Sequence, residues 1–483
     1  MENNFNHDLE VADNFRNQGQ WQSAIHIYEK IVKSFPASAS LQHNLAVCYF
    51  ALGQHRNSLA FAKAAVHLDP HLWQSEIILA KSKKELGEVS EAFQSFDNVL
   101  NKDPHNGEAL LGQADILLNI YGDPLKAIQT IQPLFEIKNF AEDARLTELM
   151  ASLYDRDESA ESLTDRIKLF AKTSIQLNRD AISFQFKKDT LKKSLKPRVG
   201  LISPMFQVSP VYFLTFDFFK KIATQCEVIF FNRGNKSDWA TDQFKMIGSE
   251  WHEVSFFDPI TLAKTIHDHN IDVLYDLGGW MDPLALKALS LKPARQQFKW
   301  VGGQSVTTGL QCFDGWMGDT WHTPQHLQHL YTEPLMNQGD DYVSYTPPPY
   351  MPKPLARKDD ALAIFANPAK LSRAFLKELR ELPGKKCFIH KQYQFEIVRD
   401  RITSFIDKKD LTFIFPETHK DALDALNQHQ TLIDTFPYSS GLTAREALAL
   451  GTQIRVLHVG SLFCERHTAR YANPSNLNKV NQP

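Results

Sequence analysis

The feature that most constrains this chain is a period of 34 residues in its N-terminal third. Glycines, prolines and small residues all recur at this spacing, at Gly19, Gly53 and Gly87, at Pro36, Pro70 and Pro104, and at Ala24, Ser58 and Ala92. Each glycine lies between two stretches with helical periodicity, and each proline stands where the second helix of a pair would end, because proline cannot continue a helix. The pattern predicts stacked helix pairs that approach closely at the small residue.

These units resemble the tetratricopeptide repeat in period, glycine, small residue and terminal proline. A fourth, more degenerate unit is displaced by one residue at Gly122 and Ala127, and residues 141–170 are expected to form a further helix pair or a cap. We assign residues 5–172 to this array. Such arrays form a superhelix whose concave face binds extended polypeptides. We therefore expect a polypeptide partner; a spacer or a dimerisation surface, and hence a homo-oligomer, is the alternative.

Composition excludes several other classes of protein. The chain has 483 residues, of which 43% are hydrophobic and 23% charged, as in soluble globular proteins of several domains. A formal net charge of -3 argues against a nucleic-acid binder. The five cysteines are scattered and never at C-x-x-C spacing, which indicates neither a disulfide framework nor a zinc site. The start has no leader pattern and no long apolar run occurs, so we expect a cytoplasmic protein without a membrane span.

The rest of the chain alternates strand and helix patterns. A polar, helical connector (173–195) leads to a first series of elements (196–344), which opens with the apolar strand RVGLIS (198–203). A proline-rich linker (345–360) separates it from a second series (361–483). Such alternation predicts a doubly wound parallel sheet in each series, that is, two Rossmann-like lobes. A ligand is expected in the cleft between them, at the carboxyl ends of the strands.

The stretch TLIDTFPYSSGLTAREALALG (431–451) is a candidate anion site. It reads as a short buried strand, a turn of small residues that includes Ser440 and Gly441, and a helix that opens near Thr443. Unpaired backbone N–H groups and the positive end of the helix dipole would converge there and suit a diphosphate. Glu446, about one turn into the helix, is placed to accept hydrogen bonds from two ribose hydroxyls. An ordinary strand-to-helix turn with a helix cap is the alternative.

Two Rossmann-like lobes suit nucleotide-sugar glycosyltransferases, but they also suit epimerases and phosphorylases. The glycine-rich segment WVGGQSVTTG (300–309) lacks the G-x-G-x-x-G order of dinucleotide binding, which argues against a dehydrogenase. We expect Gly302, Gly303, Ser305 and Thr307 to line the cleft from the first lobe. A tight strand-to-helix turn is the other interpretation of these residues.

Repeats of this type fused to two such lobes resemble the O-GlcNAc transferase family, which includes bacterial protein glycosyltransferases. The likeness can be followed over most of the chain, through RVGLISPMFQVSP, DVLYDLGGWMDPLALKALSLKPARQQFKWVGGQS, FANPAKLS, IFPETHKDAL, DTFPYSSGLTAREALALGT and GSLFCERHTAR. It implies an α-helical tetratricopeptide-repeat superhelix followed by an α/β GT-B fold. It also implies an inverting glycosyltransferase that moves a sugar from a UDP-sugar, such as UDP-GlcNAc or UDP-glucose, or less favourably a GDP-sugar, onto a protein side chain.

The resemblance also implies roles for individual residues. FANPAKLS places the family's catalytic lysine on Lys370, IFPETHKDAL places a nucleotide-contacting lysine on Lys420, and the last motif brings Arg466 into register. Lys370, Lys420 and the helix N-terminus near Thr443 would relieve charge on the leaving phosphate without a metal, and no D-x-D pair with supporting ligands stands out. The acceptor also needs a base, for which Asp276 is the first candidate.

Asp276 has competitors, and it has a structural interpretation of its own. His390 and His419 are the other candidate bases, while Asp276 alternatively caps the turn that follows its strand. The chain also departs from the family pattern, with Ser209 and Phe213 where the first-lobe loop usually carries histidines and Leu442 in place of the histidine of the diphosphate loop. These departures, and the 17 residues that follow Arg466, keep open a non-catalytic scaffold or regulatory subunit with a degenerate glycosyltransferase domain.

Overall fold

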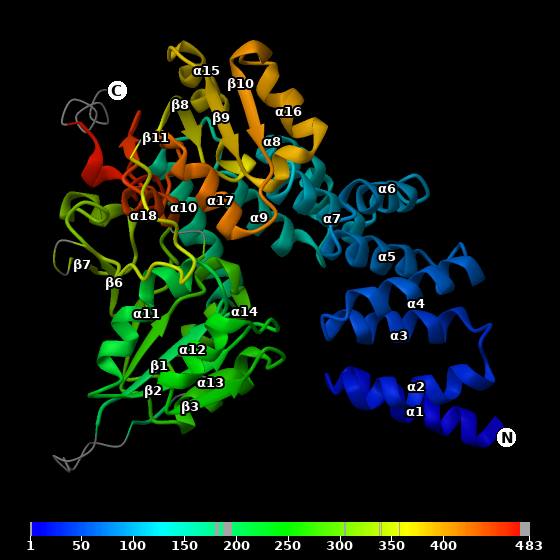
Figure 1. The fold of residues 1–483 in the computed structure, drawn as a ribbon. Coiled ribbons are helices and arrows are strands. Elements are labelled where there is room, and N and C mark those ends of the chain that lie inside the picture. The colour runs from blue at the N-terminus through cyan, green and yellow to red at the C-terminus, as the bar shows by residue number, and fades with distance from the viewer. Residues whose placement is uncertain are drawn as a thin grey trace. The chain divides into compact units, whose positions relative to one another are not determined.

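The computed structural model describes residues 2–178, 182, 184–186, 196–303, 306–337, 339, 341–356 and 358–473. Most of the expected connector, Ser305 and the last ten residues lie outside this set. The chain forms two compact units (Figure 1). The first contains Met1–Leu118 and Lys126–Thr147, and the second contains Asn119–Leu125 and Glu148–Pro483.

The first unit is built from helices that follow one another as pairs. Their bounds are α1 Glu2–Asn17, α2 Trp21–Ser34, α3 Ala39–Ala51, α4 His55–Leu68, α5 Trp73–Glu85, α6 Val89–Leu100, α7 Gly107–Asn119, α8 Pro124–Ile131 and the 3-10 turn η1 Gln132–Glu136. Figure 1 shows α1 to α6 as a stack of antiparallel pairs, in blue. The predicted repeat architecture is confirmed in this region.

The repeated residues explain the geometry of these pairs. Gly19, Gly53 and Gly87 each lie between the two helices of a pair with φ angles of 73°, 72° and 85°, a backbone conformation that suits glycine. The small residues Ala24, Ser58 and Ala92 are all fully buried, as a close approach of helices requires. The sequence period therefore reports a repeated turn and a repeated contact.

Residues 141–170 form a helix pair, α9 Ala141–Ala151 and α10 Ala160–Phe170, which continues into the π-helical turn η2 Ala171–Ile175. The segment between the helices packs within the second unit. Tyr154 stacks on Tyr438 at 4.9 Å, and Asp155 accepts from the guanidinium of Arg373 at 3.1 Å. These contacts explain why the boundary between the units falls inside α9.

The turn before α8 also belongs to the second unit and carries a glycine that nothing larger could replace. Gly122 has a φ of 68°, and a Cβ added there would lie 2.3 Å from the carbonyl carbon of Pro368. Next to this contact, the Gln392 amide donates to the carbonyl of Asn119 at 2.8 Å. The repeat turn is therefore packed directly on the loop that bears Lys370.

The first Rossmann-like lobe is a parallel sheet of order β3-β2-β1-β4-β5-β6-β7, in green in Figure 1. Its elements are β1 Arg198–Ser203, α11 Pro210–Ile222, β2 Glu227–Asn232, α12 Trp239–Ile247, β3 Glu250–Glu253, α13 Pro259–Asp268, β4 Val273–Asp276, η3 Gly279–Met281, α14 Pro283–Ser290, β5 Gln296–Lys299, β6 Gly315–Gly318, η4 Gln325–Leu330 and β7 Leu335–Asn337. The apolar run RVGLIS forms the interior strand β1, as predicted, and EVIFFN forms the neighbouring strand β2.

The second lobe is a parallel sheet of order β10-β9-β8-β11-β12. Its elements are β8 Asp359–Ile364, η5 Pro368–Lys370, α15 Arg373–Glu381, β9 Lys386–Ile389, η6 Lys391–Gln394, α16 Glu396–Thr403, η7 Lys408–Asp410, β10 Leu411–Ile414, α17 His419–Asn427, β11 His429–Ile433, α18 Leu442–Ala449, β12 Gln453–Arg455, η8 Phe463–Glu465 and η9 Ala469–Tyr471. The predicted pair of doubly wound lobes is confirmed.

Strand order fixes where a ligand site can form in each lobe. In the first lobe the order reverses between β1 and β4, and in the second between β8 and β11. Loops that leave neighbouring strands at such a switch point run to opposite faces of the sheet and open a crevice at its carboxyl edge. Among the described residues, no helix combines the length and the apolar character needed to cross a membrane.

Candidate functional site

A cavity of about 340 Å³ lies at these two switch points, within the second unit. Loops after β1, β4 and β5 form one wall, which contains Met205, Pro210, Val211, Leu214, Met281, Val301, Gly302, Gly303 and, from a later segment, Tyr342. Loops after β8, β9 and β11 form the other, together with two residues near the end of the lobe: Phe365, Ala366, Asn367, Lys370, His390, Tyr438, Gly441, Leu442, Thr443, Phe463 and His467. The volume is in the range of small-molecule sites.

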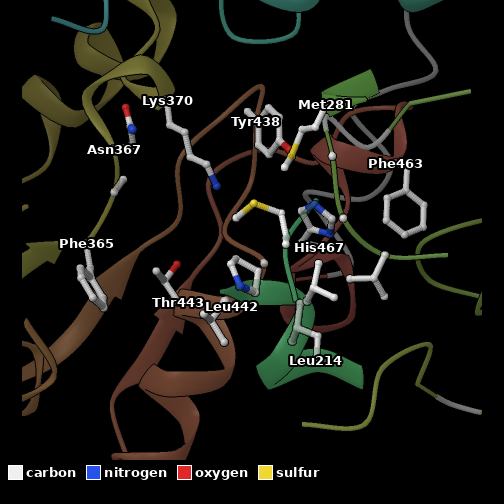
Figure 2. Close-up of a pocket in the computed structure, with 18 of the residues that line it drawn as sticks. Leu214, Met281, Phe365, Asn367, Lys370, Tyr438, Leu442, Thr443, Phe463 and His467 are labelled. Carbon is white, nitrogen blue, oxygen red and sulfur yellow. The ribbon is translucent and has the colours of Figure 1, made fainter. Parts of the chain in front are cut away.

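Lys370 extends into this cavity from η5 (Figure 2). Its ammonium donates to the backbone carbonyl of Ser439 at 2.9 Å and lies 4.6 Å from the centre of the Tyr438 ring. Burial lowers the pKa of Lys370 to about 8, although the carboxylate of Asp434 opposes this shift. The side chain is therefore a fixed, poorly hydrated cation near neutral pH.

The loop after β11 carries the second positive feature, the N-terminus of α18. Asp434 accepts from the backbone N–H of Ser440 at 2.7 Å and from the hydroxyl of Thr468, and burial raises the pKa of Asp434 to about 6. Gly441 occupies the N-cap of α18 and provides no side-chain hydrogen bond to the first turn. The amides of this turn are thus left without a side-chain acceptor beside the cavity, as an anion site requires.

Two of the three other helices of this lobe have a capped start. The N-cap side chains of α15 and α17, Ser372 and Thr418, accept from backbone N–H groups of the first turn, whereas α16, with Phe395 at its N-cap, has no side-chain cap bond. α18, which begins at the cavity, has no side-chain hydrogen bond to its first-turn amides. The same holds for α11 on the opposite wall, where Ser209 makes no cap bond. The expected placement of Gly441 and Thr443 beside Lys370 is observed, with both on the cavity wall.

Glu446 is completely buried behind this wall and is not among its lining residues. Its Oε1 lies 2.7 Å from His419 Nε2, and His419 Nδ1 lies 2.9 Å from the hydroxyl of Tyr350. The second carboxylate oxygen, Oε2, has no hydrogen-bond partner. A buried, unsatisfied acceptor of this kind is costly for the fold and indicates a missing donor.

Two expected donor-binding residues lie elsewhere. Lys420 is in the first turn of α17, where its ammonium pairs with Asp424 at 2.7 Å, and this contact raises the pKa of Lys420. It is exposed and does not line the cavity. Ser440 is buried, and its backbone N–H donates to the Asp434 carboxylate. It therefore helps to fix the shape of the turn.

Asp276 does not reach the cavity wall either. The carboxylate is buried at the end of β4 and accepts from the amides of Gly278 at 2.9 Å and Gly279 at 3.0 Å. Lys299, also buried, lies 3.9 Å from it, and its ammonium is within hydrogen-bond distance of four backbone carbonyls of the same region. Burial raises the pKa of Asp276 and lowers that of Lys299. In this geometry Asp276 holds the turn after its strand.

Gly302 and Gly303 do line the cavity, and their lack of a side chain is a steric requirement. A Cβ at Gly302 would lie 1.9 Å from the carbonyl oxygen of Leu277, and one at Gly303 would lie 2.3 Å from that of Gly278. Thr307 is buried away from the cavity, with its hydroxyl on Glu333 at 2.7 Å, and Ser305 lies outside the described residues. Apart from Tyr342, the first lobe therefore presents backbone and apolar groups to a ligand.

His390, one of the alternative bases, lies on the wall after β9. Its Nδ1 accepts the backbone N–H of Gln392 at 3.3 Å, so the proton of the neutral ring is on Nε2. Burial lowers its pKa to about 4, which keeps the ring neutral. The other alternative, His419, is engaged with Glu446 and Tyr350 as described.

The sequence reasoning missed His467, which lines the same cavity wall as Lys370 (Figure 2). Its backbone N–H donates to Ser439 Oγ at 2.9 Å, and its Nδ1 lies 3.1 Å from the hydroxyl of Tyr342. A Cβ at Gly441 would lie 3.7 Å from the ring. Burial holds the pKa of His467 well below its ordinary value, so the imidazole is neutral. His467 directly follows Arg466 in the last motif, but nothing local in that motif distinguishes it as a cavity residue.

Arg466 itself is a structural residue in this arrangement. Its Nε donates to the carbonyl of Trp321 at 2.9 Å, and its NH1 donates to that of Gly460 at 2.8 Å. It therefore ties the end of the second lobe to the segment after β6. This tether positions the next residue, His467, on the cavity wall.

Two parallel-sheet lobes with a cavity at both switch points define a GT-B-like architecture. The same fold is found in a mutant of the O-GlcNAc transferase of Thermobaculum terrenum, with a TM-score of 0.67 and 18% identity, over 98% of this chain and 87% of that one. A family model described as anaphase-promoting complex, cyclosome, subunit 3 matches residues 17–99, within the repeat region.

Curated relatives point in the same direction. The chain is 25% identical over 275 residues to the probable UDP-N-acetylglucosamine–peptide N-acetylglucosaminyltransferase SPINDLY of Solanum lycopersicum, and 26% identical over 286 residues to that of Arabidopsis thaliana. These matches cover 52% and 54% of this chain, but only 29% and 31% of the relatives. The chain thus spans about a third of the length of these relatives. Its likeness to O-GlcNAc transferases, predicted from the motifs, is confirmed in sequence and in fold.

Proposed function

We propose that this chain is a protein glycosyltransferase, which takes a UDP-sugar, in the first place UDP-GlcNAc and otherwise UDP-glucose, into the cavity and transfers the sugar to a polypeptide side chain. The names of the curated relatives support this class of donor and acceptor. One observation carries the proposal: the Lys370 ammonium is held on the same cavity wall as the uncapped N-terminus of α18.

These two groups suit the leaving diphosphate. As the bond between the sugar and the diphosphate breaks, negative charge grows on the phosphate oxygen. A fixed ammonium and preorganised amides stabilise this charge without reorganising, and one such donor typically contributes about 3 kcal/mol to the transition state. Lys370 and the first turn of α18 supply positive charge from the protein itself, so we propose inverting transfer that needs no metal ion.

His467 completes the diphosphate site in this proposal. When the Tyr342 hydroxyl donates to Nδ1, the ring proton is on Nε2, and the neutral imidazole offers an N–H beside Gly441. The family's diphosphate loop carries a histidine where this chain has Leu442. We propose that His467 supplies the equivalent donor from a different segment of the lobe.

Glu446 is proposed to bind the ribose. Its Oε2 is the buried acceptor without a partner, and a ribose hydroxyl would provide the missing donor once the wall in front of Glu446 opens to the nucleoside. Oε1 remains on His419, which fixes the carboxylate. The nucleoside would then bind on the α18 side of the cavity, and the sugar would face the first lobe.

The acceptor polypeptide is assigned to the repeat array. Arrays of this kind use their concave surface to hold extended chains.

A specific observation favours a second candidate function, a non-catalytic scaffold. Asp276 is buried in its turn, and among the described residues the first-lobe wall offers Tyr342 as its only titratable side chain. In such a scaffold, the lobes would either still bind a nucleotide or no longer bind one.

The experiment that separates these candidates uses the purified full chain with EDTA present. Thermal unfolding is measured with UDP, GDP and their sugars, and transfer is measured from radiolabelled UDP-GlcNAc and UDP-glucose to proteins of a cell extract. UDP at about 100 times its dissociation constant should stabilise the fold by about 2.7 kcal/mol, and Lys370→Ala should weaken that shift. Transfer to any protein excludes the scaffold, whereas no shift with any nucleotide contradicts the proposed donor site.

A further inference from the structure

A cluster of three potential metal ligands lies in the first lobe, apart from the cavity. Glu250 and His252 belong to β3, and His269 is the C-cap residue that follows α13. Glu250 Oε2 lies 3.0 Å from His252 Nε2 and 3.5 Å from His269 Nε2, and the three ligand atoms lie within 4.8 Å of one another. Donor atoms bound to one zinc ion at the usual bond lengths stand about 3.3 Å apart, so the spacing fits a shared cation.

The tautomer of His269 makes the cluster more than a chance meeting. His269 Nδ1 lies 2.7 Å from the backbone carbonyl of Thr265, which can only accept, so Nδ1 carries the ring proton. In the neutral ring, the Nε2 lone pair then faces a carboxylate oxygen. Two acceptors in this position repel each other unless a second ring proton or a metal cation lies between them. A backbone carbonyl on the far ring nitrogen is also the usual way in which proteins orient a metal-binding histidine.

The surrounding residues hold the three side chains in place. Phe231 is fully buried, stacks on the ring of His252 at 5.6 Å and meets the ring of His269 edge-on at 5.7 Å. The other oxygen of Glu250 accepts from Arg198 at 2.6 Å. Arg198 also pairs with Glu227 at 2.6 Å, so its charge is shared between two carboxylates. The ligands therefore need little ordering when a cation binds.

We propose that Glu250, His252 and His269 bind one divalent cation of the zinc type. Two imidazoles and one carboxylate are the donor set that zinc and its neighbours in the first transition row accept, whereas calcium and magnesium prefer oxygen alone. The side chains keep 33%, 27% and 24% of their surface exposed, so a cation can enter and water can complete the coordination.

The cation would act on the fold of the lobe rather than on sugar transfer. None of its ligands lines the cavity. β3 is the last strand at one edge of the sheet, and the site would fasten this short strand to the end of α13. Edge strands are the part of a sheet most open to fraying and mispairing. Binding is therefore expected to raise the unfolding temperature and to leave the metal-free chemistry proposed above unchanged.

The test titrates zinc chloride into the full chain, freed of any affinity tag, by calorimetry in a buffer that does not bind metals. We expect one tight site per chain and an unfolding temperature that rises by a few degrees with zinc and falls again with EDTA. The variant with both His252→Gln and His269→Gln should lose the tight site, whereas His326→Gln, which changes an exposed histidine outside the cluster, should keep it. Tight binding that survives in the double variant, or no tight site in the wild type, would overturn the proposal.

A second measurement does not depend on any variant folding well. Cobalt(II) bound to the wild-type chain should show the visible d–d bands of a four- or five-coordinate nitrogen and oxygen site. Zinc should displace it with the calorimetric stoichiometry. An intense near-ultraviolet band from a cobalt–thiolate bond would instead locate the metal on a cysteine such as Cys226 and refute the assignment.

Discussion

The two walls of the cavity differ in the chemistry that they offer a ligand. The first-lobe wall consists of apolar side chains and the glycines Gly302 and Gly303, with Tyr342 as its polar group. The second-lobe wall carries Lys370, His390, His467 and the uncapped start of α18. Positive charge and hydrogen-bond donors are thus concentrated on one side. In the function proposed above, the second lobe would bind the donor's phosphates, while the first lobe would supply shape.

The largest test of this division is Lys370→Met. Loss of the ammonium should lower kcat/KM for transfer about 10²- to 10³-fold, because the leaving diphosphate loses a preorganised cation. Stability should not fall at pH 7. The pKa of Lys370 is lowered to about 8 in the fold, so holding the buried group charged costs stability below that pH, and methionine removes the cost. Steady-state kinetics and thermal unfolding measure both effects, and near-normal activity would place the phosphates elsewhere.

The next effect concerns His467. Replacing it with alanine should lower kcat/KM about ten- to a hundredfold, as expected for a lost hydrogen bond to a charged group. Glutamine keeps an N–H near the position of Nε2, whereas asparagine keeps a polar group near Nδ1 and Tyr342. Recovery with glutamine and not with asparagine would confirm the donor role. The opposite order would show that the contact with Tyr342 is what matters.

The pH profile tests the same wall without a mutation. In the proposed function, protonated Lys370 is the active form. Because its pKa is lowered to about 8, kcat/KM should fall about tenfold per unit as pH rises beyond that value. His467 and His390 have lowered pKa values and stay neutral, so they should add no step near pH 7. Lys370→Arg should move the alkaline limb upward; an unchanged limb would assign it to another group.

The smallest expected effect is that of Lys420→Ala. Lys420 is exposed and paired with Asp424, outside the cavity, so kcat/KM and the UDP-induced shift in unfolding temperature should change less than about twofold. Asp424→Ala is the matched control for loss of the surface pair. A large loss specific to Lys420 would mean that its side chain turns toward the nucleotide when donor is bound.

The sequence was most informative where a physical pattern repeats or runs uninterrupted. The 34-residue period predicted the helix pairs, because each glycine and each small residue serves the same turn and contact. The apolar run RVGLIS predicted β1, an interior strand of the first sheet. Short polar strands such as β3, EWHE, carry little apolar signal and were not predicted.

The site was predictable only where backbone position decides the outcome. Lys370, Gly441 and Thr443 follow strands at the switch point, and topology brings such loops together. Side-chain direction is not encoded in this way: Lys420 turns along its own helix to Asp424, and Asp276 turns back to its own loop. His467 reaches the cavity through tertiary contacts from a segment after β12, so no local pattern marks it.

The contact between Gly122 and Pro368 bears on how a chain of this kind can be cut or recombined. Residues 119–125 and 148 onward fold with the glycosyltransferase-like lobes, through Tyr154 on Tyr438, Asp155 on Arg373 and the repeat turn on the loop of Lys370. A fragment that starts at residue 196 would leave these surfaces bare. The smallest transferable module, in the laboratory or in evolution, therefore carries part of the repeat array with it.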